Sequence, residues 1–119
     1  MKPVYIDLNS RSALIVVDVQ NDFCPGGALA VPGGDDIVPA LNGWIGRFRE
    51  SGLPVVFTQD WHPVNHCSFA VQGGIWPVHC VQDTTGSAFH PGLEVPPLGD
   101  NVSFFKKGFL PDREAYSGF

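Results

Sequence analysis

The sequence predicts an α/β domain built on a parallel β-sheet, and three features of this 119-residue chain support that prediction. Short apolar runs rich in β-branched residues are typical of strands buried on both faces, as in parallel sheets. Apolar residues at helical spacing lie between the first two runs, which gives a strand–helix–strand unit with a right-handed crossover. Gly and Pro, present 14 and 11 times, mark the loops between these elements.

The first strand is expected over residues 13–17 (ALIVV), before the turn-forming stretch DVQNDFCPGG. The helix follows, with Asp35 as its N-cap and Gly52 as its stop. Its apolar face comprises Ile37, Val38, Leu41, Trp44, Ile45 and Phe48. Two further buried strands are expected over residues 54–58 (PVVFT) and 102–105 (VSFF).

Residues 61–101 show little periodicity and many Gly and Pro, so they are expected to form a long loop, and such loops are often functional. Three strands and one helix make a thin domain whose sheet has an open edge. We therefore expect residues 1–119 to form the front part of a larger α/β domain.

Composition argues against several classes of protein. The net charge is −5 and no basic stripe occurs, which argues against a nucleic-acid partner. The longest apolar run, residues 13–17, is far too short to span a membrane, and the first residues lack the apolar core of a signal peptide. Three Cys at irregular spacing do not suggest a disulfide framework. The sequence therefore predicts a cytoplasmic protein.

Charged side chains collect at the ends of the three expected strands. The first strand ends at Asp18, and the second leads into Asp60 and His62. The third ends at Lys106 and Lys107. Parallel strands bring their carboxyl ends to one edge of the sheet, which is where open α/β folds bind ligands. A functional site is therefore predicted at this edge.

Asp60 and His62 are two positions apart, so their side chains point the same way if the chain is extended and can share a cation. His66 and His79 are the available third ligands. Such a set suits Zn, Fe or Mn, and ligand type alone does not choose between these metals. On the Asp–His pair alone, a polar loop with hydrogen-bonded histidines is the better explanation.

The other residues also have two interpretations each. Asp18 either caps a turn or acts as a general base. Lys107 is either a surface charge or a cation that stabilises a neighbouring anion. Three loop aromatics, Phe23, Trp76 and Tyr116, either cap the core or wall a flat, apolar ring substrate. Taken singly, each structural interpretation is favoured; together, at three strand ends, the residues favour a site.

Four stretches of the chain match the motifs of a known family in order and spacing. They are ALIVVDVQNDFCPGGALAVPGG, VVFTQDWHPVNHCSF, WPVHCVQDTTGSAFHPGL and FFKKGFLPDREAYSGF. With these motifs, which cover nearly the whole chain from Ala13 onward, the sequence resembles the nicotinamidases of the isochorismatase-like cysteine hydrolase superfamily. The resemblance implies a three-layer α/β fold, a mostly parallel sheet with flanking helices, that is incomplete in residues 1–119.

The resemblance also implies a reaction. In the family, a Cys thiolate attacks the amide carbon of nicotinamide, ammonia leaves, and water hydrolyses the thioester to nicotinic acid, a step of NAD salvage. Asp18 and Lys107 match the family's catalytic Asp and Lys. Phe23, Trp76 and Tyr116 match the residues that enclose the ring.

A divalent metal ion is implied by the same resemblance, with Asp60, His62 and His79 as its ligands and zinc as the first choice before iron or manganese. His66 matches a position that some members use as a further ligand. In the family this metal holds the pyridine nitrogen. The implied partner is therefore a small molecule, nicotinamide, and assembly into a homo-oligomer stays open.

One member of the family's catalytic set has no counterpart in the sequence. The nucleophilic Cys of the family lies in a later motif, downstream of YSGF, whereas Cys24, Cys67 and Cys80 stand in other motifs. We therefore expect the nucleophile-bearing C-terminal part to be absent from residues 1–119, and this chain alone to be inactive. The alternatives are a related cysteine hydrolase for another amide and a non-catalytic metal- or pyridine-binding fragment.

Overall fold

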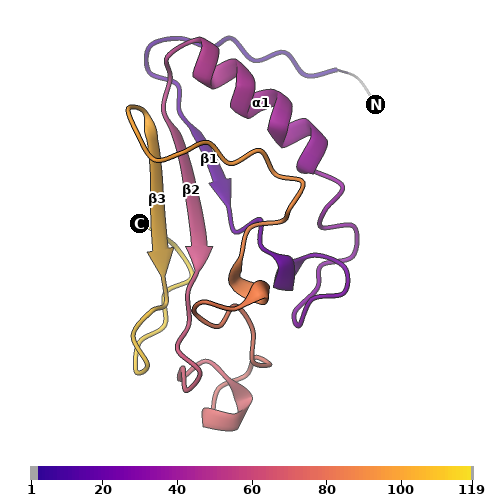
Figure 1. Cartoon of the computed structure of the whole chain (residues 1–119), viewed down its shortest axis with the longest axis vertical. Helices are drawn as coiled ribbons and strands as arrows, with labels where there is room; N and C mark the ends of the chain where they lie inside the picture. Colours follow the sequence, from indigo (N-terminus) through magenta and orange to yellow (C-terminus); the bar gives the residue numbers. More distant parts are fainter. Residues whose placement is uncertain (1–2, 119) are drawn as a thin grey trace.

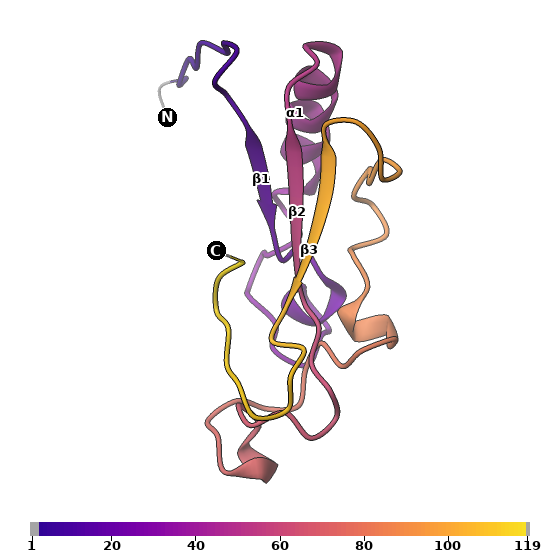
Figure 2. The ribbon, with the colours of Figure 1, turned by 90° about the vertical axis from the view of Figure 1, so that its left-hand side faces the viewer.

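The computed structural model describes residues 3–118 and has an α/β fold, as predicted. Three strands form one parallel sheet in the order β1 (Leu14–Val17), β2 (Val55–Asp60) and β3 (Val102–Lys107). Helix α1 (Val38–Glu50) connects β1 to β2 and lies along one face of the sheet (Figure 1). The three arrows point the same way, and the loops gather beyond the arrowheads (Figures 1 and 2).

Two of the strands run further than the sequence predicted. β2 and β3 each continue two residues beyond their expected ends, so Asp60 and Lys107 are the last residues of neighbouring strands and pair in register. Asp18 follows β1 directly, and its backbone N–H donates to the Thr58 carbonyl (3.1 Å). The strand ends therefore bring these three charged residues to one edge, as the parallel-strand argument predicted.

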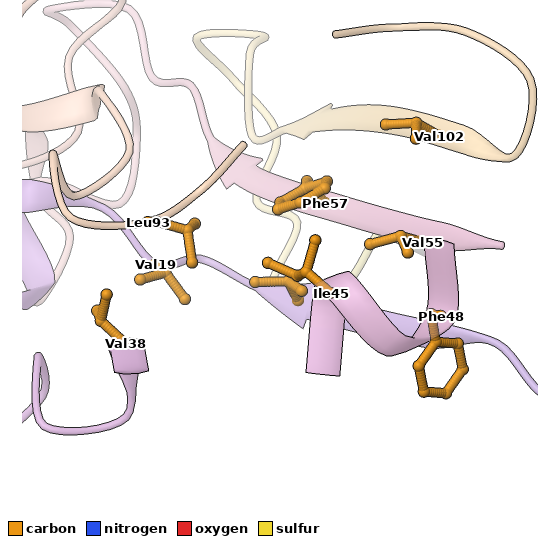
Figure 3. Close-up of a cluster of buried hydrophobic side chains, with 9 residues drawn as sticks. Val19, Val38, Ile45, Phe48, Val55, Phe57, Leu93 and Val102 are labelled. Atoms are coloured by element: carbon orange, nitrogen blue, oxygen red, sulfur yellow. The ribbon is translucent and has the colours of Figure 1, made fainter. Parts of the chain in front are cut away.

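Alternation along the strands builds the core. Val16, Val55 and Phe57 are buried on the face that α1 covers, and Ile45 and Phe48 of the helix pack against them (Figure 3). Burying a side chain of this size contributes about 1.5–3 kcal/mol to stability relative to exposing it. The core therefore fixes the register of the sheet, and with it the positions of the strand ends.

The start of α1 differs from the sequence prediction, whereas its end agrees. Asp35 is not the N-cap: Ile37 is, without a side-chain cap, and Pro39 occupies the first turn, where its missing N–H leaves no bond unmade. Asp35 instead accepts the Val38 N–H through its backbone carbonyl in a turn before the helix. Gly52 lies just past the helix end with φ +67°, a left-handed conformation that Gly adopts easily.

The second face of the sheet is open in the described residues. Ile15, Val17 and Phe105 are 42, 59 and 51% exposed, although parallel sheets are normally covered on both faces.

In residues 61–101 the expected long loop contains two single turns of 3-10 helix, Ala70–Gln72 and Thr85–Ser87. Within residues 3–118, no helix combines the length and the apolar character that crossing a membrane requires.

Candidate metal and substrate site

A lysine joins the carboxylates at the strand ends. The Lys107 ammonium donates to Asp18 Oδ2 (2.7 Å) and to Asp60 Oδ1 (2.5 Å), and its side chain is nearly buried. Charge-assisted bonds of this kind are the stronger class of hydrogen bond. The three side chains form one ionic unit rather than separate surface charges, so the surface interpretation of Lys107 does not describe this structure.

The backbone at Asp18 is strained in a way that aims its side chain. Asp18 has φ +54°, which non-glycine residues adopt at a cost of about 1–2 kcal/mol. Its Oδ1 accepts a hydrogen bond from the Thr58 hydroxyl (2.7 Å), while Oδ2 faces Lys107. Strained residues of this kind cluster at functional sites.

Asp60 and Lys107 each favour the ionised state of the other. Burial by itself raises the pKa of Asp60, but the nearby imidazoles of His62 and His79, the hydrogen bond from Lys107 and the lysine charge outweigh it and hold that pKa well below its usual range. Burial likewise lowers the pKa of Lys107, yet its bonds to Asp18 and Asp60 raise it overall. Both groups therefore stay charged at neutral pH.

Two histidines converge on Asp60. Asp60 Oδ2 lies 3.4 Å from His62 Nε2 and 3.7 Å from His79 Nε2, and the three atoms all lie within 4.8 Å of one another. A backbone hydrogen bond in the loop supports this arrangement. The His62 N–H donates to the Cys80 carbonyl (2.9 Å), which brings His62 and His79 together. All three residues are buried.

The donor set fits a divalent transition metal. His62 Nδ1 lies 2.8 Å from the Gly108 carbonyl and His79 Nδ1 2.7 Å from the Pro77 carbonyl, so each Nδ1 carries the proton and donates it. In the neutral rings, each Nε2 then presents a lone pair toward a carboxylate oxygen, and such a group of acceptors requires a cation. Tetrahedral zinc ligands at about 2.1 Å from the ion lie about 3.4 Å apart, close to the distances found here.

His66 differs from the other two histidines. Its Nε2 lies 2.8 Å from the Arg113 carbonyl and its Nδ1 2.7 Å from the Ser68 hydroxyl, so both ring nitrogens have partners. Among the described residues, the group that could hold a metal consists of Asp60, His62 and His79 and does not include His66. The ring instead stacks on His62, with centroids 4.2 Å apart.

A pocket of about 210 Å³ unites the predicted site. Its lining includes the nine residues that the family resemblance assigns to the site, namely Asp18, Phe23, Asp60, His62, His66, Trp76, His79, Lys107 and Tyr116, whereas Lys106 lies outside it. The Trp76 indole N–H donates to the Tyr116 hydroxyl (3.1 Å), and the Phe23 ring lies 5.7 Å from His79. The charged groups therefore lie beside aromatic walls, as a small polar ring compound requires.

Two residues that support the proposed metal ligands were not predicted from the sequence. Buried Gln20 accepts the Asp60 N–H (2.9 Å) and donates to the Asp60 carbonyl (2.8 Å), which fixes the backbone of the central ligand. Asp22 accepts the N–H of Cys80 (2.7 Å), the residue after His79. Both residues belong to the polar run that follows the first strand, and this run was the only sequence feature that could have indicated them. Their hydrogen-bonding partners lie about 40 to 60 residues away in the chain, so the sequence did not reveal the contacts.

Gly108 is expected to be essential for holding His62. It has φ +63°, and a Cβ there would lie 2.5 Å from His62 Cε1. Gly108→Ala should therefore displace the imidazole and weaken zinc binding about 10–100-fold, as loss of outer-shell support usually does. Titration calorimetry with zinc measures the change. Gly43→Ala in α1 is the control, because nothing lies within 4 Å of its new methyl group. Equal zinc affinity of Gly108→Ala and the unmodified protein would contradict the expectation.

Comparison with known proteins places the chain in a family. The model of the isochorismatase domain matches residues 12–111. The chain belongs to the isochorismatase family. The nicotinamidase of Escherichia coli (strain K12) is 43% identical over 90% of this chain and 56% of its own length. The nicotinamidase/pyrazinamidase of Mycobacterium tuberculosis is 41% identical over 90% of this chain and 56% of its own length.

Solved structures show the same isochorismatase-family fold. The crystal structure of the pyrazinamidase of Pyrococcus horikoshii in complex with zinc is 53% identical, with a TM-score of 0.80 over 90% of this chain and 57% of that one. A nicotinamidase/pyrazinamidase from Acinetobacter baumanii has a TM-score of 0.83 at 40% identity, over 95% of this chain and 59% of that one. This isochorismatase-family chain thus spans somewhat more than half the length of the relatives it matches.

Proposed function

We propose that this chain is part of a nicotinamidase, which converts nicotinamide to nicotinic acid and ammonia in pyridine nucleotide salvage in the cytoplasm. One observation carries the proposal: the Lys107 ammonium joins Asp18 to Asp60, and so connects an Asp–Lys pair to the group that could hold a metal. Relatives named nicotinamidase, at 43 and 42% identity, support the same substrate.

The proposed metal ligands are Asp60, His62 and His79. Zinc is the favoured ion, because a relative's structure is a complex with zinc and because two imidazoles and a carboxylate suit it. Iron and manganese accept the same ligand types. The bound ion would act as a Lewis acid toward the pyridine nitrogen, so that the ring is held and its amide is oriented.

Asp18 is proposed to transfer the proton of the reaction, and Lys107 to stabilise the carboxylate charge. Asp18 takes the thiol proton of a nucleophilic cysteine, and the thiolate forms a C–S bond to the amide carbon. As the C–N bond breaks, Asp18 returns the proton to the leaving nitrogen, which departs as ammonia. Water then cleaves the C–S bond and releases nicotinic acid. Lys107 stabilises the negative charge of Asp18 before it takes the proton and after it returns it.

The nucleophile is proposed to come from outside residues 1–119. None of Cys24, Cys67 and Cys80 belongs to the pocket lining. Burial, with the charge of Asp35, raises the pKa of Cys24, and burial together with nearby carboxylates raises that of Cys80, so neither forms a thiolate readily.

We accordingly propose that residues 1–119 are the N-terminal part of one isochorismatase-like domain. The chain spans 56% of the length of the Escherichia coli relative, which leaves room for the nucleophile-bearing part. The open sheet face with Ile15, Val17 and Phe105 is a suitable surface for that part to cover.

Ring recognition offers a direct experiment on the proposed substrate. Benzamide has the shape of nicotinamide without the ring nitrogen, so it should bind the zinc-loaded protein about 100-fold more weakly or worse. Competition against nicotinamide turnover in the complete enzyme measures both affinities. In an Asp60→Ala variant, direct binding measurements should show that the difference between the two amides is gone. Equal affinity of the two compounds for the zinc-loaded protein would refute recognition through the ring nitrogen.

A further inference from the structure

We infer that His66 is a positioning residue that fastens a strap, residues 111–116, over the pocket, and that it does not bind the metal. The inference deepens the proposed function, because the strap forms one wall of the proposed ring site. It assigns to His66 a role different from that of the neighbouring metal-ligand candidates.

The hydrogen bonds of His66 give it a fixed orientation. A carbonyl oxygen can only accept, so the contact with the Arg113 carbonyl (2.8 Å) requires the proton on Nε2. Nδ1 then accepts from the Ser68 hydroxyl (2.7 Å) and from the Ser68 backbone N–H (3.3 Å). A neutral His66 in this tautomer has no lone pair left for a metal, whereas the other two histidines carry the proton on Nδ1.

The strap depends on such contacts because it has little structure of its own. Residues 111–116 contain no helix or strand, and each of these residues is exposed. Exposed segments without regular structure open at low free energy. A bond from His66, which is 1% exposed, is therefore a strong constraint, since water competes poorly for a buried donor.

Two further contacts secure the same strap from the loop that carries His66. The Cys67 N–H donates to the Pro111 carbonyl (2.8 Å), and the Trp76 indole N–H donates to the Tyr116 hydroxyl (3.1 Å). His66 lies between these two contacts along the strap, at Arg113. The strap is thus attached near both ends and in the middle.

The position of His66 links the strap to the proposed metal site. Its ring stacks on His62 at a centroid distance of 4.2 Å, while the strap contributes Glu114, Ala115 and Tyr116 to the pocket lining. One side chain therefore contacts a proposed metal ligand and the pocket wall. Release of the strap would open this wall to water and loosen the enclosure of the ring without removing a metal ligand.

The test replaces His66 in the complete protein by Phe, which keeps an aromatic ring on His62 but cannot donate to Arg113. Three readouts follow: zinc content, amide hydrogen exchange of residues 111–116, and the Kd of nicotinate, the product of the proposed reaction. We expect zinc content to stay near that of the unmodified protein, exchange in the strap to rise about tenfold, and the Kd to rise about tenfold, as loss of one hydrogen bond predicts. His90→Phe, outside the pocket, should change none of them.

A second variant keeps the test decisive if Phe is not accommodated. His66→Gln places an amide donor near the Arg113 carbonyl but supplies a poor zinc ligand. We expect zinc to be retained and the strap to regain protection against amide exchange relative to His66→Phe. Loss of zinc from His66→Gln, with the strap still protected, would overturn the inference and make His66 a ligand. Unchanged strap exchange in His66→Phe would overturn it as well. Absence of nicotinate binding in the unmodified protein would instead refute the proposed function, and strap exchange would still decide the role of His66.

Discussion

Replacing Lys107 by Met is expected to abolish activity and to destabilise the protein strongly. The Lys107 ammonium is the hydrogen-bonding partner of the buried carboxylate of Asp60 and of the partly buried carboxylate of Asp18. Removing one member of a buried ionic group typically costs about 3–5 kcal/mol, because the remaining charges lose their partner. The loss of turnover should reach about 10⁴-fold, as for other members of cooperating catalytic sets.

Chemical denaturation and ammonia release from nicotinamide measure the two effects in the complete protein. Lys106→Met is the matched control: this neighbouring lysine is exposed and lies over the Trp61 ring (3.7 Å to the centroid), so the change should be small in both assays. A Lys107→Met protein as stable as the Lys106→Met protein would show that the ionic unit does not hold the strand ends together.

Asp60→Ala is expected to remove the metal and, with it, turnover. Asp60 Oδ2 is the atom on which both histidine Nε2 atoms converge, at 3.4 and 3.7 Å, so the variant loses the anionic ligand. Metal content should fall below about a tenth of an equivalent. Cys67→Ser should retain the metal, because Cys67 belongs neither to the ligand group nor to the pocket lining.

Asp60 also predicts the response of the metal-free protein to acid. Burial opposes its charge, but its contacts with His62, His79 and Lys107 hold its pKa well below the usual range. A lowered folded-state pKa contributes stability above the unfolded value, about pH 4, and that stability is lost as the pH falls below it. Urea unfolding between about pH 3 and pH 6 should therefore show a steeper fall for the unmodified protein than for Asp60→Asn. Parallel curves would contradict this role.

The edge of the sheet was predictable because it depends on local patterns. Three apolar runs specify parallel strands, and parallel strands bring Asp18, Asp60 and Lys107 together whatever the loops do. The error at Asp35 has a local cause: Asp35 lies three residues before the first helical residue, whereas Pro39, which suits the first turn, favours a helix that begins at Val38.

The loops could not be predicted in the same way, because their contacts join distant parts of the chain. His66 and His62 look alike as sequence, yet the Nε2 of one meets Arg113, 47 residues away, and the Nε2 of the other meets Asp60. In the sequence Gln20 is an ordinary turn residue, and its hydrogen bond with Asp60 of β2 forms only in the folded structure. Such pairings depend on tertiary structure and leave no periodic signal.

We propose that Asp60, His62 and His79 hold one divalent metal beside the Asp18–Lys107 pair. Elemental analysis of purified, chelator-treated protein, after incubation with zinc, manganese or iron and removal of excess ion, tests it most directly. We expect about one equivalent of one of these metals in the unmodified protein. Less than about a tenth of an equivalent of every metal would contradict it, since three buried lone-pair donors would then converge for some other reason.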